Sequence, residues 1–451
     1  MITGAASGPH DLVGVGFGPS GLALAVAFDD EGPPADAVFL ERGEGFAWHE
    51  AMLIEGARLQ VSCLKDLATL RDPCSRFTFL NYLRSVGRLD EFINLGDMRP
   101  TRTEFNDYLR WAAARVSAPV RFGREVVSVE PEPGTEDGAV HALRVTARNL
   151  GDGRTETYLA RNLVVATGGV PRVPPELSVS SGRVFHSQAF LQRLAECYAD
   201  RDRPWRFVVV GEGQSGAEIF DHLASCYPRA RVTAALRGIG YRPMDETPFV
   251  NEVFFPGWVD FFYALPEEKR RQIYRDIRNT NYAVVDAGLI DRIYRRMYDA
   301  RVSGDTALRI VPFLEPRGAQ ETESGVRVEF RNVVDGSATT MEADAVILAT
   351  GYVRPGRHPL LSGVSAYLRT DEAGRYMVGR GYRVQAAPGF LPGVFLQGHC
   401  QETHGISDSL LSVISTRASE VRAGIAARLA EELVLSRDGR PRAPQPAVAE
   451  V

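Results

Sequence analysis

The amino-acid sequence predicts an α/β fold with two Rossmann-like dinucleotide-binding domains and a small, mostly helical insertion. Two glycine-rich loops support this prediction, because residues 14–19 read Gly-Val-Gly-Phe-Gly-Pro and residues 211–216 read Gly-Glu-Gly-Gln-Ser-Gly. Each loop follows an apolar run and precedes a helix-forming stretch, which is the order that a dinucleotide site requires. Glycines let the backbone approach a pyrophosphate, and the next helix N-terminus supplies free N–H groups. The candidate loop residues are Gly14, Gly16, Gly18, Pro19, Gly211, Gly213 and Gln214.

The charged residue that follows each loop indicates which dinucleotide binds there. After the first loop, the predicted strand at residues 37–40 ends in Glu41, where an acid holds a ribose 2′-hydroxyl group. After the second, the strand at residues 232–236 ends in Arg237, whose guanidinium suits a 2′-phosphate. Either charge alone is equally compatible with a solvated strand end, but their opposite signs favour two distinct sites. We therefore expect FAD at the first loop and NADPH at the second.

Length, composition and charge exclude several classes of protein. A chain of 451 residues suggests two or three domains, and its net charge of −5 argues against nucleic acid as a main partner. No apolar run reaches the roughly 18 residues that span a bilayer, and no signal peptide is evident, so we expect a cytoplasmic protein. The five scattered cysteines lack a Cys-x-x-Cys pair, which excludes a dithiol flavoenzyme. The eight histidines show no metal-ligand spacing, so we expect no metal.

Two similar segments divide the chain into its expected domains. Residues 162–168 and 344–351 each form an apolar run that ends in Ala-Thr-Gly, as in two-dinucleotide flavoproteins where the chain crosses between domains. Helical periodicity is clearest at residues 103–116, which Thr103 is expected to cap, and at 267–278, 289–301 and 407–435. The expected domains are a disordered N-terminus at 1–10, an FAD-binding domain at 11–200 and 345–436, an NADPH-binding domain at 201–244 and 305–344, a helical substrate-binding insertion at 245–304, and a disordered tail at 437–451.

Several short motifs carry a resemblance to a known family. Besides the first loop, they are Phe-Ala-Trp-His at 46–49, Leu-Gln-Val-Ser-Cys-Leu-Lys-Asp-Leu at 59–67, Pro-Phe-Val-Asn-Glu at 248–252, Asn-Thr-Asn-Tyr-Ala-Val-Val-Asp at 279–286 and His-Gly-Ile-Ser-Asp-Ser-Leu-Leu-Ser at 404–412. The chain resembles, over roughly residues 10–425, the L-ornithine N5-/L-lysine N6-monooxygenases of siderophore biosynthesis. The Asn-Thr-Asn-Tyr motif is more similar to the ornithine branch.

The resemblance implies an activity and a substrate site. Members of this family bind FAD and NADPH, form a C4a-hydroperoxyflavin from molecular oxygen while NADP⁺ is retained, and hydroxylate a terminal amine. Lys65 matches the lysine that pairs with the carboxylate of the amino acid, and Asn251 and Asn281 match the asparagines that hold its polar ends. Ser412 matches the segment near the amine, with Ser409 as a competing assignment.

The resemblance also implies cofactor contacts. Gln60 matches an amide near the reactive edge of the flavin, and we expect Gln60 and Asn281 to take part in catalysis. Trp48 and His49 match residues of the FAD-binding domain. The matches to positions that contact NADPH are Arg102, Ser215 and Arg237. Family members often form tetramers, so we expect a homo-oligomer.

The chemistry of amine hydroxylation suits these residue types. The nitrogen must be neutral to attack an electrophilic oxygen, yet an aliphatic amine with a pKa of about 10 is mostly protonated at neutral pH. A pocket favours the neutral form by desolvation and by uncharged acceptors, whereas a carboxylate would stabilise the ammonium. Asparagine and serine at the expected contacts meet this requirement.

Three alternatives remain open. The first is L-lysine as substrate. The second is a Baeyer–Villiger or broad-specificity flavin monooxygenase, whose fingerprint is matched by Gly182, His186 and Phe190, although Ser180 replaces its leading phenylalanine. The third is a non-catalytic flavoprotein that senses or merely oxidises NADPH. The end product in the favoured interpretation is a hydroxamate siderophore or a related natural product.

Overall fold

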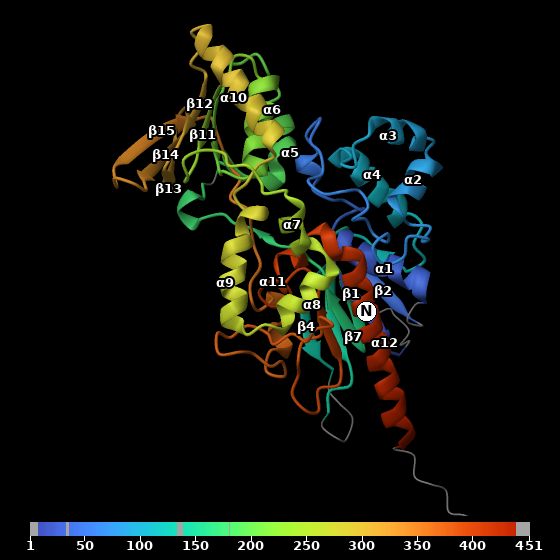
Figure 1. Cartoon of the computed structure of the whole chain (residues 1–451). Helices are drawn as coiled ribbons and strands as arrows, with labels where there is room; N and C mark the ends of the chain where they lie inside the picture. Colours follow the sequence, from blue (N-terminus) through green and yellow to red (C-terminus); the bar gives the residue numbers. More distant parts are fainter. Residues whose placement is uncertain (1–7, 33–35, 133–138, 180, 439–451) are drawn as a thin grey trace, which may run out of the picture.

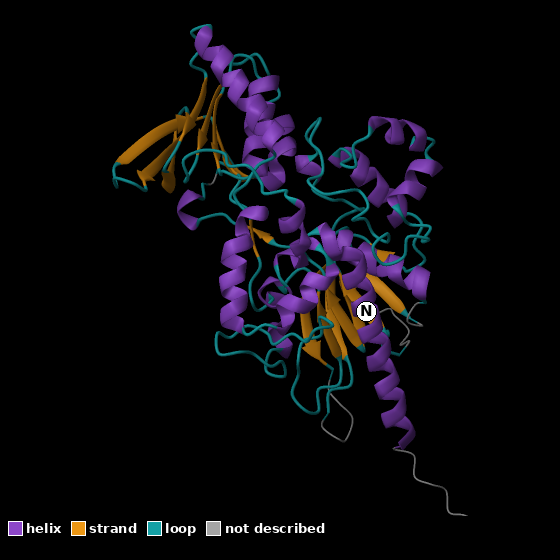
Figure 2. Ribbon diagram, viewed as in Figure 1, coloured by secondary structure: helices purple, strands orange, loops and turns teal. Residues whose placement is uncertain are grey.

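The computed structural model describes residues 8–32, 36–132, 139–179 and 181–438, and it contains two five-stranded parallel sheets (Figures 1 and 2). The first sheet has the order β18-β7-β1-β2-β3, formed by β1 (Leu12–Val15), β2 (Ala37–Leu40), β3 (Val120–Arg121), β7 (Asn162–Val165) and β18 (Gly393–Leu396). The second has the order β12-β11-β10-β16-β9, formed by β9 (Val184–His186), β10 (Arg206–Val210), β11 (Arg231–Ala235), β12 (Leu308–Val311) and β16 (Ala345–Leu348). The predicted α/β class with two Rossmann-like units is confirmed.

Helices pack on each parallel sheet, because strands that are buried on both faces need apolar partners on both sides. In the second unit the other face, which carries Val208 and Val346, packs against the antiparallel segment that contains Val328. Residues of β1 and β7 are all buried, and the same is true of β16. In the first unit, α1 (Pro19–Glu31) packs against α12 (Ile414–Asp438) and α4 (Arg102–Ala113). In the second, α6 (Gln214–Cys226) lies beside α10 (Ala287–Val302) in Figure 1, and α5 (Phe190–Cys197) packs nearby.

Each unit carries a three-stranded antiparallel sheet before its returning strand. In the first unit this sheet consists of β4 (Arg124–Pro131), β5 (Leu143–Asn149) and β6 (Thr155–Ala160). In the second it consists of β13 (Leu314–Thr322), β14 (Gly325–Asn332) and β15 (Ala338–Ala343). The two units therefore share one topology, in which the three-stranded antiparallel sheet is inserted directly before β7 or β16.

The chain crosses between the units after the two Ala-Thr-Gly segments. There, β8 (Val170–Pro171) pairs with β17 (Tyr352–Val353) in an antiparallel ribbon, so both crossings lie side by side. The expected domain limits are wrong at these edges, because β9 and β16 belong to the second sheet rather than to the unit of the first loop. The crossing falls near residues 170 and 352 instead of 200 and 345. Strands β7 and β16 are both short buried runs followed by Ala-Thr-Gly, and this shared pattern gives no local signal of which sheet each one joins.

The insertion is shorter than residues 245–304. It contains α7 (Pro248–Asn251), η4 (Glu252–Phe254), α8 (Pro256–Ala264), α9 (Glu267–Ile277) and η5 (Arg278–Thr280). Helix α10 does not belong to it, because Leu289, Ile293 and Met297 pack into the core of the second unit. The reason is topological: β11 and β12 are parallel, so a crossover must join them, and α10 forms part of it. Helices α8 and α9 instead contact α11 (Gln401–His404).

Three local expectations also need correction. Helix α4 begins at Arg102 and is capped by Thr101, whose Oγ1 accepts from the Glu104 N–H at 3.1 Å, so Thr103 is not its cap. The helix expected at 407–435 begins at residue 414, after the 3₁₀ turns η7 (Ile406–Ser409) and η8 (Leu411–Val413). His10 is ordered and forms a β-bridge with Ala160, whereas residues 1–7 lie outside the described chain.

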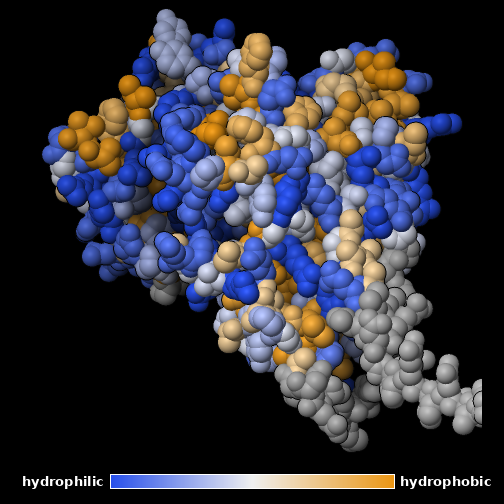
Figure 3. Space-filling model, turned by 60° about the horizontal axis from the view of Figure 1, so that its bottom comes forward, coloured by the Kyte–Doolittle hydropathy of each residue, from blue (hydrophilic) through white to orange (hydrophobic). Residues whose placement is uncertain are grey.

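Small helices complete the first unit: α2 (Phe79–Ser85), α3 (Leu89–Leu95) and the 3₁₀ turns η1 (Glu50–Met52) and η6 (Pro359–Val364). The turns η2 (Pro175–Leu177) and η3 (Ser187–Ala189) flank β9. The tail from 439 onward and Ser180 lie outside the described residues. The face in Figure 3 is mostly hydrophilic, with separate hydrophobic patches. Among the described helices, none combines the length and apolar character needed to cross a membrane.

Candidate nucleotide and substrate cavity

A cavity of about 2190 Å³ lies where the carboxyl ends of both sheets meet. Segments that follow β1, β2, β7 and β18 line it on one side, and segments that follow β10, β11 and β16 line it on the other. Open parallel sheets bind ligands at this edge, because the loops that leave the strands diverge there. The cavity is therefore placed to hold two dinucleotides and a small substrate between them.

The first glycine loop forms a cradle at the N-terminus of α1. Gly16 has φ +92°, and a Cβ atom on it would lie 2.7 Å from the Ala166 carbonyl oxygen, so only glycine fits. Gly18 caps α1 without a side-chain hydrogen bond, and Pro19 is its first residue. Gly14 differs from the expectation, because it does not line the cavity. It lies in buried β1, where a Cβ atom would meet the Phe39 ring at 2.4 Å, so it serves strand packing.

Glu41 stands at the end of β2 and faces the cavity. Its Oε2 accepts from the Phe17 N–H at 2.7 Å, and its Oε1 accepts from the Gly43 N–H at 2.8 Å. These two bonds fix the carboxylate in place, while each oxygen keeps a lone pair for a further donor such as a ribose hydroxyl.

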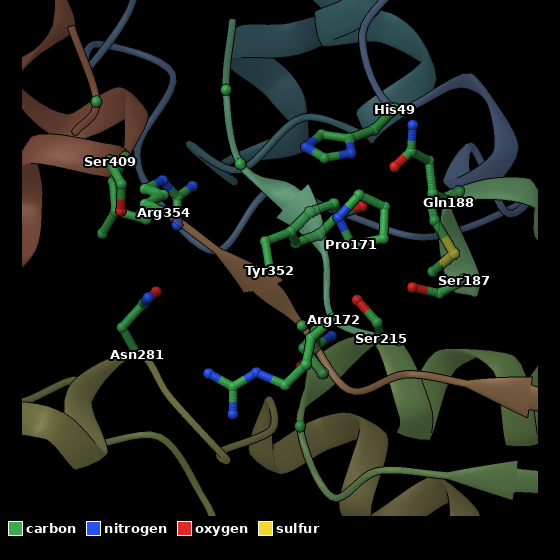
Figure 4. Close-up of a pocket in the computed structure, with 18 of the residues that line it drawn as sticks. His49, Pro171, Arg172, Ser187, Gln188, Ser215, Asn281, Tyr352, Arg354 and Ser409 are labelled. Atoms are coloured by element: carbon green, nitrogen blue, oxygen red, sulfur yellow. The ribbon is translucent and has the colours of Figure 1, made fainter. Parts of the chain in front are cut away.

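The second loop repeats the cradle at α6. Gly211 has φ +140°, and its Cβ would lie 2.3 Å from the Ala349 carbonyl oxygen. Gly213 caps α6 without a side-chain hydrogen bond, and Ser215 projects into the cavity (Figure 4). Gln214 also lines the cavity, although its amide bonds Glu218 at 2.8 Å and the backbone N–H of Asp286 at 2.8 Å. Two uncapped helix N-termini thus open onto one space, which fits two pyrophosphate groups.

The two predicted arginines, Arg237 after β11 and Arg102 at the start of α4, both line the cavity. Arg237 lines the cavity with 73% of its side chain exposed, and its only described ion pair is a long contact of 3.9 Å to Glu315. Arg102 is more constrained, since it donates to the Glu218 carboxylate at 2.5 Å and to the Met52 carbonyl at 3.2 Å. Arg102 therefore ties α4 of the first unit to α6 of the second at the cavity wall.

Several cavity residues have buried polar atoms without a hydrogen-bond partner among the described residues. They include the amide nitrogen of Gln60, both amide atoms of Gln397, both ring nitrogens of His399 and the hydroxyl of Ser412. An unpaired buried polar atom is costly, so such a cluster around one cavity indicates a missing polar ligand. These residues and the two cradles fit bound dinucleotides.

Lys65 lines the cavity, and no carboxylate of the described residues lies within salt-bridge distance of its ammonium. Its Nζ instead lies 4.3 Å from the ring centroid of Phe255 and 5.6 Å from that of Phe254. Desolvation lowers the pKa of its ammonium, so an anion placed beside it would be bound favourably. The printed sequence has only two lysines among 52 basic side chains, Lys65 and Lys269.

The expected amide and hydroxyl groups gather in the same space. Asn281 and Ser409 project into it from opposite sides, with Arg354 and Tyr352 nearby (Figure 4). Asn251 lines the cavity and donates to the Glu246 carbonyl at 3.1 Å. Ser409 already accepts a hydrogen bond from the Gln401 amide, whereas the buried Ser412 hydroxyl is free of described partners.

Trp48 and His49 line the cavity. Trp48 packs edge-on against Phe105 at 5.9 Å, so it anchors the wall to α4. His49 adopts the left-handed conformation with φ +50°. Desolvation, with added repulsion from Arg102 and Arg354, lowers the pKa of His49 to about 4. The imidazole is therefore neutral at physiological pH.

The partial Baeyer–Villiger fingerprint has a structural role here. His186 bonds the Gly351 carbonyl through Nε2 at 2.9 Å and accepts from the Gln188 N–H through Nδ1 at 3.1 Å. It does not line the cavity, and Phe190 is fully buried in the core of the second unit. Both residues thus stabilise the region around β9.

Sequence reasoning missed several cavity residues. Gln397 and His399 follow β18, an edge strand that the sequence analysis does not predict. Ligands bind at the carboxyl ends of parallel strands, so a prediction of β18 would have pointed to both residues. Arg354 follows the second Ala-Thr-Gly segment by three residues, a position that marks the crossing. Tyr274 and Gln401 lie on helices whose cavity-facing sides follow only from tertiary packing.

Fold and cavity together define a protein that binds two dinucleotides face to face, as NADPH-dependent flavoproteins do. The family model for L-lysine 6-monooxygenase/L-ornithine 5-monooxygenase matches residues 8–354. An L-ornithine N(5)-monooxygenase of Pseudomonas aeruginosa is 40% identical, covering 95% of this chain and 98% of its own length. One from Emericella nidulans is also 40% identical, over 91% and 88%. The chain belongs to this family.

Solved structures agree with this assignment. The ornithine hydroxylase of Pseudomonas aeruginosa is 39% identical with a TM-score of 0.87, covering 94% of this chain and 100% of that one. The Kutzneria sp. 744 ornithine N-hydroxylase, solved with reduced FAD, NADP⁺ and L-ornithine, is 38% identical with a TM-score of 0.89 over the same shares. The L-lysine 6-monooxygenase of Pseudomonas syringae is 31% identical with a TM-score of 0.81, over 93% and 100%.

Proposed function

We propose that this chain is an L-ornithine N5-monooxygenase that uses FAD and NADPH. It converts L-ornithine, molecular oxygen, NADPH and a proton into N5-hydroxy-L-ornithine, NADP⁺ and water. Its product feeds a hydroxamate siderophore or a related natural product. Family membership and 40% identity to curated ornithine monooxygenases support this activity. The lysine enzyme, at 31% identity among the solved structures, is less similar.

One observation carries the proposal: the unpaired Lys65 ammonium shares a cavity with two dinucleotide cradles. A lysine that is partly desolvated and has no acidic partner among the described residues is suited to binding a substrate carboxylate. An amino acid anchored there by its carboxylate extends its side chain across the cavity. An oxidase or NADPH sensor does not require such an anchor.

The chain's own residues determine where each cofactor lies. The Gly16–Gly18 cradle, Glu41 and the unpaired amide of Gln60 would hold FAD. The Gly211–Gly213 cradle with Ser215 and Arg237 would hold NADPH. Bound FAD, once reduced by NADPH, supplies activated oxygen, of which one atom goes to the amine and the other leaves as water.

The substrate residues orient the amine and keep it uncharged. Lys65 binds the carboxylate and thereby sets how far the side-chain nitrogen reaches. Asn251 and Asn281 supply amide groups at the polar ends, and Ser412 or Ser409 lies nearest the amine. Amide and hydroxyl oxygens accept a hydrogen bond without the fixed negative charge that would stabilise an ammonium. A chain longer by one methylene displaces the nitrogen by over about 1 Å, which costs on the order of 10²-fold in rate.

The decisive experiment offers L-ornithine and L-lysine together with FAD and NADPH and identifies the products by mass spectrometry. We expect N5-hydroxyornithine as the main product. Hydroxylysine as the main product would reassign the substrate, and oxygenation only of added ketones or thioethers would support the Baeyer–Villiger alternative. NADPH oxidation that ornithine does not affect would support the non-catalytic alternative.

The substitution Lys65→Met tests the anchor within the same assay. We expect the KM for ornithine to rise about 100-fold, because a half-buried charge partner of the carboxylate is lost, while reduction of the flavin by NADPH is unchanged. Lys269→Met is the matched control, since Lys269 is exposed on α9. An unchanged KM in Lys65→Met would remove this residue from the substrate site.

We also propose that the protein acts in the cytoplasm as a homo-oligomer, a tetramer by family resemblance. All five cysteines are free thiols, which suits a reducing compartment. Light scattering after size-exclusion chromatography measures the assembly directly, and a monomeric mass would contradict the proposed tetramer.

A further inference from the structure

A strained turn carries Asn281 into the cavity. The turn follows η5, and Tyr282 N–H donates to the Arg278 carbonyl at 3.0 Å. The next residue, Ala283, has φ +59°, a left-handed conformation that costs about 1 kcal/mol or more for a residue with a Cβ atom. Such a turn persists only when neighbouring groups hold it in place.

The side-chain amide of Gln401 forms hydrogen bonds that hold this turn in place. Its Nε2 donates to the Tyr282 hydroxyl at 2.5 Å and to the Ser409 hydroxyl, with a longer contact of 3.4 Å to the Ile406 carbonyl. Its Oε1 accepts from the Tyr274 hydroxyl at 3.3 Å. The two amide hydrogens and the carbonyl oxygen are thus all used, and no uncharged side chain other than an amide offers this set.

The four side chains come from separate segments: α9, the turn after η5, α11 and η7. All four line the cavity, as does Asn281. Tyr274, Tyr282 and Leu410 also pack around the small apolar cluster of Val253, Phe254 and Ile406. The amide is therefore a polar link between the insertion and the C-terminal loop at the cavity wall.

We propose that Gln401 is a positioning residue for the proposed hydroxylation. It ties the turn that bears Asn281 to the segment that bears Ser409 and Ser412, and so fixes the two sides of the amine pocket relative to each other. This inference rests on the proposed function. It adds a residue that acts through Tyr282 and Ser409.

The network also brings no carboxylate to this wall. Desolvation, with a further contribution from Tyr282, raises the pKa of the Tyr274 phenol, so it remains protonated. An amide at position 401 satisfies both hydroxyls without bringing a carboxylate into the pocket. The hydrogen bonds of Gln401 therefore both shape the pocket and favour a neutral amine.

The test uses full-length enzyme with FAD bound. Gln401→Met keeps the length of the side chain but removes all four hydrogen bonds of the amide. We expect the KM for ornithine to rise roughly 10-fold, as the loss of one or two neutral hydrogen bonds predicts, and less hydroxyornithine to form per NADPH consumed. The rate of flavin reduction by NADPH should stay unchanged, because the cradles are not touched.

Tyr282→Phe removes only one hydroxyl and keeps the ring in its apolar cluster. We expect a smaller change in the same direction, and we expect the double variant Tyr282→Phe/Gln401→Met to be no worse than Gln401→Met alone, since both act through one bond. Glu402→Gln is the matched control on the same helix, because Glu402 faces away and pairs with Arg375 at 2.7 Å.

Two outcomes would overturn the inference: an unchanged KM and product yield in Gln401→Met, or effects of the two substitutions that multiply in the double variant. If Gln401→Met does not fold, Tyr282→Phe alone decides, since unchanged KM and yield in that variant contradict the proposal. A wild-type enzyme that forms no hydroxyornithine would instead refute the proposed function.

Discussion

The two nucleotide cradles share one plan but differ in how firmly their strand-end charges are held. Glu41, after β2, has both carboxylate oxygens fixed by backbone N–H groups at 2.7 and 2.8 Å. Arg237, after β11, is 73% exposed and reaches Glu315 only at 3.9 Å. The Glu41 carboxylate is therefore fixed before a ligand arrives, whereas the Arg237 side chain must be ordered by its ligand.

This difference matches two kinds of cofactor. A preformed site loses little conformational freedom on binding and so retains its ligand tightly. A site that relies on an exposed arginine must order that side chain on binding, so it binds more weakly and exchanges its ligand. We therefore expect FAD to stay bound through many turnovers, while NADPH enters and NADP⁺ leaves in each one.

The largest effect is expected from a substitution that disrupts the glycine loop of the first unit. Gly16→Ala puts a Cβ atom 2.7 Å from the Ala166 carbonyl oxygen and forces alanine into φ +92°. Backbone strain of about 1–2 kcal/mol adds to the clash, so we expect a protein with little bound flavin and a lower unfolding temperature. Flavin absorbance and thermal unfolding measure both. Gly45→Ala is the control, because its Cβ meets nothing within 4 Å. Full flavin content in Gly16→Ala would contradict a preformed cradle.

The second prediction concerns the exposed arginine. Arg237→Ala should raise the KM for NADPH roughly 10- to 100-fold, because a charged contact to the 2′-phosphate is lost. It should also release more hydrogen peroxide per NADPH, since retained NADP⁺ protects the activated oxygen. Flavin content should not change.

NADH provides the internal control for Arg237→Ala, because it lacks the 2′-phosphate and its KM should stay the same. Arg301→Ala, an exposed position on α10 outside the cavity, controls for general loss of positive charge. Unchanged NADPH affinity and coupling would remove Arg237 from the site.

The third prediction is a pH dependence of stability that arises mainly in the first unit. Desolvation lowers the pKa of His49 and His404 to about 4 and that of His399 to about 3, against 6.5 when unfolded. The unfolded chain therefore binds more protons, and the stability present above pH 6.5 is lost as pH falls toward 4. Each histidine contributes up to about 1.4 kcal/mol per pH unit.

Urea unfolding at several pH values measures this dependence. His404→Gln should reduce the slope between pH 6.5 and about 4, because Gln keeps polar partners for Thr403 and the Arg380 carbonyl without titrating. His222→Gln, on α6 of the second unit, should reduce it less, because His222 is only partly buried. Equal effects would contradict the assignment of acid sensitivity to the first unit.

Most of the candidate cavity was predictable because it depends on local rules. Each glycine loop follows its strand closely in sequence, and so does the first turn of α1 or α6. The charged residues Glu41 and Arg237 likewise come directly after a strand. The predicted residues line one cavity, with the exception of Gly14, whose role in packing against Phe39 depends on a strand 25 residues away. The functional roles of these residues remain predictions that the variants above test.

The sequence by itself determined the class of ligand, because backbone freedom at Gly16 and Gly211 and the sign of the following charge are properties of single residues and short segments. Only the tertiary structure decided which sheet each Ala-Thr-Gly strand joins, that α10 is a crossover helix, and that Gln401 meets Tyr282. Strands as alike as β7 and β16 choose their neighbours by long-range packing. Residues 119 positions apart become hydrogen-bond partners only after the insertion folds against α11.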